Sequence, residues 1–202
     1  MAKRARPNKD APAKRARPNK EEFQRLQDVV PERPRLLLVG INPGRRSGTV
    51  GHHFAGNGNP FWRLLHASGL TPVLVPYEED QRLATFGIAL TNLCARTTRT
   101  AAELTRAEIE TGRAILADKI ARWRPAVVAF VGVTLYGLYF GKQASSRGPG
   151  AKSETLSGAR VFVVPNPSGL NASFPGFAHK LVWFKRLRTF VDRVTEGAAE
   201  SG

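Results

Sequence analysis

Four short apolar segments, each bounded by turn-forming or charged residues, constrain the fold of this chain more than any other feature of its sequence. They lie at 35–39, 86–90, 126–131 and 160–164. Each has the length of a single strand and falls short of the length of a core helix. We therefore predict four strands that are buried within one sheet.

Helical patterns separate these predicted strands. The clearest pattern follows Thr105, which forms a capping box with Glu108 and precedes apolar residues at helical spacing until Pro125. Further helices are predicted over 61–67, 135–140 and 177–194. Strands that alternate with helices predict an α/β fold, a three-layer α/β/α sandwich with a short, mainly parallel central sheet.

Three asparagines follow the predicted strands. Asn42 comes after the first, Asn92 after the second and Asn166 after the fourth. Ligands of such sheets bind beyond the carboxyl ends of the strands, so these side chains are expected to converge on one site. Asn42 and Asn166 are each followed by proline, and the glycines beside Asn42 allow a ligand to approach backbone N–H groups closely.

The residues that directly follow the four strands include no Asp or Glu. Carboxylate-bound magnesium, two-metal nuclease chemistry and paired-carboxylate glycoside hydrolysis are therefore poor fits. His52 and His53 have no third ligand nearby and are interpreted as part of a polar loop, so no metal or cofactor is predicted. The single cysteine, Cys94, can form neither an internal disulfide nor an iron–sulfur site. Chemistry based on orientation and on stabilisation of a leaving group remains.

The chain is strongly basic, with a net charge of +15 over 202 residues. Residues 1–20 contain the octapeptide Ala-Lys-Arg-Ala-Arg-Pro-Asn-Lys twice, with eight basic residues and one acidic residue, which leaves +8 for residues 21–202. We predict a disordered cationic arm over 1–20, a catalytic domain over 21–195 and a flexible tail over 196–202. A solubilising tail and a nuclear-import signal are alternative interpretations of the arm. A chain this basic is expected to bind nucleic acid.

No apolar run approaches the roughly 20 residues that cross a bilayer, and no apolar signal core follows Met1. We therefore expect a soluble protein without a membrane partner, and the single cysteine suits a reducing compartment.

Four motifs occur in a specific order: Gly40-Ile41-Asn42-Pro43-Gly44, Phe54-Ala55, Asn59-x-Phe61-Trp62 and Asn166-Pro167-Ser168-Gly169-Leu170. They resemble the motifs of the mismatch-specific uracil-DNA glycosylase and thymine-DNA glycosylase family, over about residues 35–190. The resemblance implies a monofunctional DNA glycosylase for base excision repair. Such an enzyme flips uracil, or a related base as in G:U pairs, out of the duplex and hydrolyses its N-glycosidic bond without a cofactor. The single cysteine excludes the iron–sulfur branches.

The resemblance also implies roles for individual residues of the base pocket. Asn42 would position the attacking water, and the backbone around Ile41 together with Asn166 would stabilise negative charge on the departing base. Phe54 would stack on the flipped base, although a core position for this ring is an alternative. Asn92 would accept from uracil N3–H and donate to O4, and an Asx turn that closes the strand is an equally supported interpretation. Phe61 and Trp62 are predicted to lie in the core.

DNA contacts are expected from two segments. Ser168, Gly169 and Leu170 correspond to the loop inserted into the duplex, where Leu170 would fill the vacated space. The following Asn171-Ala172-Ser173 lacks the arginine that some relatives carry. The arm would contact phosphates through its basic residues, among them Lys3, Arg4, Arg6, Lys14, Arg15 and Arg17.

Two alternatives to this function stay open. One is a non-enzymatic nucleic-acid-binding protein that coats phosphates with its arm and with Lys180, Lys185, Arg186 and Arg188. The other is a glycosylase that prefers another lesion, such as xanthine or an ethenocytosine. For a glycosylase of either substrate preference, the expected partner is double-stranded DNA and the expected state is a monomer. The expected location is the nucleoid in the cytoplasm of a bacterium or the nucleus of a eukaryote.

Overall fold

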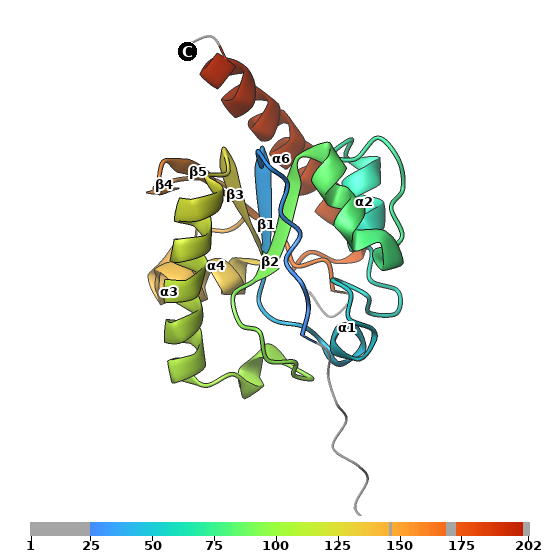
Figure 1. The fold of residues 1–202 in the computed structure, drawn as a ribbon, viewed down its shortest axis with the longest axis vertical. Helices are drawn as coiled ribbons and strands as arrows, with labels where there is room; N and C mark the ends of the chain where they lie inside the picture. The colour runs from blue at the N-terminus through green and yellow to red at the C-terminus, as the bar shows by residue number, and fades with distance from the viewer. Residues whose placement is uncertain (1–24, 146, 169–172, 200–202) are drawn as a thin grey trace, which may run out of the picture.

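The computed structural model describes residues 25–145, 147–168 and 173–199. Its centre is a five-stranded sheet with the order β2-β1-β3-β5-β4 (Figure 1). The parallel strands are β1 (Leu36–Gly40), β2 (Ile88–Asn92), β3 (Val127–Val131) and β5 (Ala159–Val164). The four predicted strands are thus confirmed, with bounds that shift by at most two residues.

The fifth strand, β4 (Gly150–Leu156), was missed by the sequence pattern. It pairs antiparallel with β5 at the edge of the sheet, and its register is interrupted between Ala151 and Thr155. An edge strand has one neighbour and can expose alternate residues, so its sequence, Gly-Ala-Lys-Ser-Glu-Thr-Leu, carries no continuous apolar run. Polar edge strands of this kind leave a weak signal in a sequence.

Helices cover both faces of the sheet (Figure 1). On one face, α2 (Phe61–Ala67), α6 (Gly176–Ala199) and the 3₁₀ segment η1 (Tyr77–Phe86) pack against alternate strand residues such as Leu36 and Leu38. On the other face, α3 (Arg106–Trp123) and α4 (Val133–Phe140) cover the intervening residues, such as Leu37 and Val39. Three short helices complete the set: α1 (Arg45–Val50), η2 (Ala101–Glu103) and α5 (Lys142–Ser145). The predicted three-layer sandwich is confirmed.

The bounds of the helices follow local signals in most places. α3 begins after Thr105, whose side chain accepts from the Glu108 backbone N–H in the expected capping box. α6 continues to Ala199, past residue 195 where the catalytic domain was expected to end and into the predicted tail, and no proline lies between these two positions. Among the described residues, no helix has the length and apolar character that crossing a bilayer requires.

Gly112 lets α3 lie directly on the chain that leaves β2. A Cβ atom at this position would lie 2.3 Å from the carbonyl oxygen of Leu93, which is backbone and cannot turn away. We expect overpacking in Gly112→Ala to lower the free energy of unfolding by about 1–3 kcal/mol. The higher helix propensity of alanine offsets roughly 1 kcal/mol of this loss. Urea denaturation measures the difference. Gly197→Ala in α6, where a Cβ meets nothing within 4 Å, is the matched control, and equal stability of both variants would contradict the expectation.

Candidate active site

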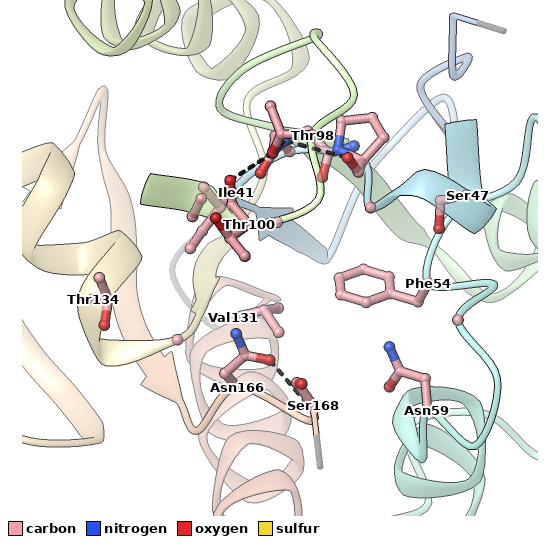
Figure 2. Close-up of a pocket in the computed structure, with 18 of the residues that line it drawn as sticks. Ile41, Ser47, Phe54, Asn59, Thr98, Thr100, Val131, Thr134, Asn166 and Ser168 are labelled. Carbon is pink, nitrogen blue, oxygen red and sulfur yellow. Dashed lines mark hydrogen bonds between the residues drawn. The ribbon is translucent and has the colours of Figure 1, made fainter. Parts of the chain in front are cut away.

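The carboxyl ends of the parallel strands open into a cleft of about 1090 Å³. Its lining includes the three asparagines singled out by the sequence, together with Ile41, Phe54 and Ser168. Chain segments far apart in the sequence meet here because the parallel strands all end at this edge (Figure 2). The structure therefore brings all the described candidates for base contact into one cleft, while Gly169, Leu170 and the predicted arm lie outside the described residues.

Asn42 is held by the loop that follows β2. Its Nδ2 donates to the carbonyl oxygen of Arg96 at 2.9 Å, to Thr98 Oγ1 at 2.7 Å and to the carbonyl oxygen of Pro43 at 3.2 Å. These acceptors fix the amide nitrogen on the loop side. The carboxamide oxygen is thus the end of Asn42 that remains to accept a hydrogen bond in the cleft.

Thr98 is a site residue that the sequence did not reveal. Its own hydroxyl donates to the carbonyl oxygen of Thr100 at 2.8 Å, so the oxygen is left to accept from Asn42. Thr98 lies 56 positions from Asn42 in the chain, and a threonine in a loop has no spacing that would mark it. Only the fold shows that it orients the asparagine.

Arg96 anchors this same loop to helix α3. Its guanidinium forms a salt bridge with Glu108 and donates to the carbonyl oxygen of Glu103 at 2.7 Å. The Arg96 hydrogen bond, with those from Thr105, lowers the pKa of Glu108 to about 2. The carboxylate is therefore charged at neutral pH, and the loop that orients Asn42 is tied to the start of α3.

Asn166 forms an Asx turn at the end of β5. Its Oδ1 accepts from the Ser168 backbone N–H at 2.9 Å, which leaves the Nδ2 end pointing away from that turn (Figure 2). Lys180 of α6, only 2% exposed, donates to the carbonyl oxygen of Ser168 at 3.2 Å. The segment before the predicted insertion loop is thus held from both sides.

Phe54 stacks on Phe61, with ring centroids 3.8 Å apart and planes inclined by 15°. Its backbone has φ of 50°, a left-handed conformation that costs a phenylalanine of order 1–3 kcal/mol. Phe54 is only partly buried and lines the cleft, so its position combines the two alternatives: it packs on the core and also forms a wall of the cleft. The prediction that Phe61 and Trp62 lie in the core is confirmed, since they are 0% and 7% exposed.

Asn59 also lines the cleft beside Phe54 (Figure 2). Its Oδ1 accepts from the Phe61 backbone N–H at 3.1 Å at the start of α2, which turns Nδ2 toward the cleft. The sequence marked Asn59 as part of a motif without a role, and the structure places a side-chain donor there.

His52 and His53 lie in a loop, as interpreted from the sequence, but the His53 side chain is buried and does not face solvent. This side chain is 2% exposed and lies beside Asn92, whose Nδ2 is 3.4 Å from His53 Nδ1. Burial is the main reason why the pKa of His53 is lowered. Among the described residues, no group of three or more His, Cys, Asp or Glu side chains is arranged to hold a metal ion.

The mouth of the cleft is basic. Arg45, Arg46 and Arg99 are exposed and belong to its lining. The Arg46 guanidinium is also held, because it donates to the Tyr77 hydroxyl at 3.1 Å. A cleft with a cationic entrance favours an anionic ligand.

Comparison with known proteins shows which family this chain belongs to. The model of the Uracil DNA glycosylase superfamily matches residues 27–188. A G/U mismatch-specific uracil DNA glycosylase from Schizosaccharomyces pombe is 33% identical over 169 residues, which are 80% of this chain and 52% of that protein. The chain thus spans about half the length of this curated relative.

A solved structure shares the fold. It is the solution NMR structure of a Methanosarcina acetivorans protein provisionally assigned as a uracil DNA glycosylase, with a TM-score of 0.54 and 22% identity. The match covers 82% of this chain and 98% of that one. With the family model spanning the whole sheet and every described motif of the cleft, the chain belongs to the uracil DNA glycosylase superfamily.

Proposed function

We propose that this protein is a monofunctional DNA glycosylase that removes uracil, above all uracil mispaired with guanine, and leaves an abasic site for base excision repair. The observation that carries the proposal is the chemistry of the cleft. Its described lining supplies amide, hydroxyl, imidazole and guanidinium groups, and no carboxylate is among these residues. Membership of the superfamily and the activity named for the Schizosaccharomyces pombe relative support uracil in G/U mispairs as the substrate.

A flipped pyrimidine fits this cleft by stacking and by its polar edge. The face of Phe54 that is not covered by Phe61 offers a flat surface for the ring. Asn92 and Asn59 present amide groups from neighbouring walls. Stacking accepts any pyrimidine, so discrimination between bases depends on the amides.

The reaction in such a cleft depends on departure of the base. The bond between C1′ and N1 breaks, its electron pair leaves with uracil, and positive charge grows on the sugar. Ile41 and Asn166 both line the cleft, and in the proposed reaction the backbone N–H of Ile41 and Nδ2 of Asn166 would stabilise the negative charge at uracil O2. Water then adds to C1′, with a hydrogen bond to Asn42 Oδ1, and gives up its proton to solvent. An amide is a weak base, so a slow enzyme is expected.

DNA binding follows from the charges around the cleft. Arg45, Arg46 and Arg99 at its mouth would contact phosphates on either side of the flipped nucleotide. Ser168 leads into the loop that would enter the duplex through Gly169 and Leu170. We propose that the protein acts as a monomer on double-stranded DNA, in the compartment that holds the chromosome.

A strand-cleavage assay tests the function. The protein is incubated with duplexes that carry one G:U, G:T, G:xanthine, G:ethenocytosine or G:C pair, and abasic sites are then cut with alkali. Cleavage that is fastest with G:U supports the proposal. Faster cleavage at another lesion would change the substrate, and binding without cleavage of any duplex would favour the non-enzymatic alternative.

Asn92→Ala tests recognition of the base. We expect the variant to lose roughly 1–3 kcal/mol of transition-state stabilisation on uracil, or about 5- to 150-fold in single-turnover rate, because a paired set of hydrogen bonds is removed. Ethenocytosine has no N3–H, so its excision should fall much less. Asn57→Ala is the matched control, since Asn57 is exposed and absent from the cleft lining. Equal losses on both bases would assign Asn92 a structural role.

A further inference from the structure

His53 is the buried titratable group of the cleft to which the proposed chemistry gives no task. Its ring lies between the cleft and an adjoining cavity of about 400 Å³, and it contributes to the lining of both. Its backbone N–H donates to Asp80 Oδ2 at 2.9 Å, and Asp80 is itself 2% exposed. The backbone at His53 is therefore held by a buried carboxylate of η1.

The contacts of the His53 ring determine which nitrogen carries the proton. Nε2 lies 2.9 Å from the carbonyl oxygen of Gln27, which can only accept, so Nε2 must be the N–H. In the neutral ring, Nδ1 then carries a lone pair and can only accept. Its neighbour is Asn92 Nδ2, at 3.4 Å, which can donate.

The ring is kept in this neutral form by its surroundings. Burial lowers the pKa of His53, and Lys119 of α3 acts in the same direction. The hydrogen bond to Gln27 and the charges of Asp80 and Asp28 oppose the shift without reversing it. At neutral pH the lone pair on Nδ1 is therefore available to Asn92.

This contact fixes the orientation of the Asn92 carboxamide. With Nδ2 turned to His53, Oδ1 lies over Gly40, 2.4 Å from the point where a Cβ atom of residue 40 would stand. The same point is 3.4 Å from Cζ of Phe54, so the oxygen lies beside the ring on which the base would stack. Glycine at position 40 is what leaves room for it.

We propose that His53 is a positioning residue that selects uracil over cytosine by holding the Asn92 carboxamide with its oxygen toward the base. The proposal rests on the proposed glycosylase function. Uracil presents N3–H, which donates to this oxygen, whereas cytosine presents a bare N3 lone pair that the oxygen repels. If the amide turned by half a rotation, Nδ2 would face the base and suit cytosine instead. Cytosine is abundant in undamaged DNA, so the amide orientation is the feature that protects it.

The test compares 5-fluorouracil and 5-fluorocytosine opposite guanine, because fluorine stabilises both departing bases and makes both single-turnover rates measurable. The quantity compared is the rate on 5-fluorouracil divided by the rate on 5-fluorocytosine. Leucine cannot accept from Asn92, so in His53→Leu we expect this ratio to fall by on the order of 10-fold, the value of one hydrogen bond. His53→Gln can donate to Gln27 and accept from Asn92, so it should keep the ratio within about 2-fold of wild type. His66→Leu on the exposed face of α2 is the matched control.

A double-substitution cycle separates positioning from a merely structural effect. When Asn92 is already alanine, adding His53→Leu should leave the ratio unchanged, and a further change would show that His53 acts through the loop. A wild-type ratio in His53→Leu would overturn the proposal alone, whereas failure of the wild-type protein to release uracil would overturn the glycosylase function. If His53→Leu does not fold, the proposal is tested by the tautomer of the His53 ring in the wild-type protein, which long-range ¹H–¹⁵N correlation NMR measures. A proton on Nε2 supports the proposal and a proton on Nδ1 overturns it.

Discussion

Replacing Asn42 by alanine is expected to slow single-turnover uracil excision by on the order of 10²-fold or more, with little change in affinity for duplex DNA. The reason is the fixed orientation of its amide: Nδ2 is bound by Arg96 and Thr98, and Oδ1 is left to hold the attacking water. The described cleft contains no carboxylate that could replace it. Single-turnover rates at saturating enzyme, beside the dissociation constant of an undamaged duplex, measure the two quantities.

Asn42→Asp tests whether the orientation of the Asn42 side chain matters more than its basicity. A carboxylate is a stronger base, and residue chemistry alone would favour faster excision. In the structure, however, it would place an oxygen against the carbonyl oxygens of Arg96 and Pro43, where the amide now donates. We therefore expect Asn42→Asp to be slower than wild type. Asn57→Ala should match wild type, and an Asn42→Ala rate within a few fold of it would exclude Asn42 from the water-positioning role.

Much of the fold could be predicted because its determinants are local. The apolar segments of β1, β2, β3 and β5 and the capping box of α3 act over a few residues, and the structure agrees with each. The edge strand β4 could not be predicted, because its residues are half exposed and its pairing depends on β5. The length of α6 beyond residue 195 likewise depends on the absence of a stop signal, which is weaker evidence than its presence.

The residues of the site show the same difference between local and long-range determinants. Asn42, Asn92 and Asn166 could be found because each lies at or just after the end of a strand, and these strand ends meet at one edge. Thr98 and His53 could not, since their importance comes from single contacts with Asn42 and Asn92 that span 56 and 39 positions of the chain. A pair of adjacent histidines in a loop gives no indication that one of them is buried. Residues that present groups to a ligand are thus easier to predict than the residues that orient them.

Deleting residues 1–20 is expected to weaken binding to undamaged duplex strongly at low salt and to flatten its salt dependence. The segment carries eight basic residues and one acidic residue, and removing one phosphate-binding cation reduces the slope of log K against log salt by about 0.9. Engagement of half the basic residues implies a change of roughly 3 to 4 in that slope, which is on the order of 10²-fold in relative affinity between 50 and 200 mM salt. Titration of a labelled duplex across salt concentrations measures it.

The rate of the chemical step should not decrease together with the affinity for DNA. Asn42, Phe54 and Asn166 all belong to the described cleft, and Arg45, Arg46 and Arg99 remain at its mouth to hold the substrate. Single-turnover excision at saturating enzyme should therefore stay near wild type in the truncated protein. A full-length variant with the eight basic residues of the segment replaced by glutamine separates charge from length, and it should behave like the deletion. An unchanged salt slope in both variants would mean that the segment does not touch DNA, and loss of saturated turnover would mean that it takes part in forming the active site.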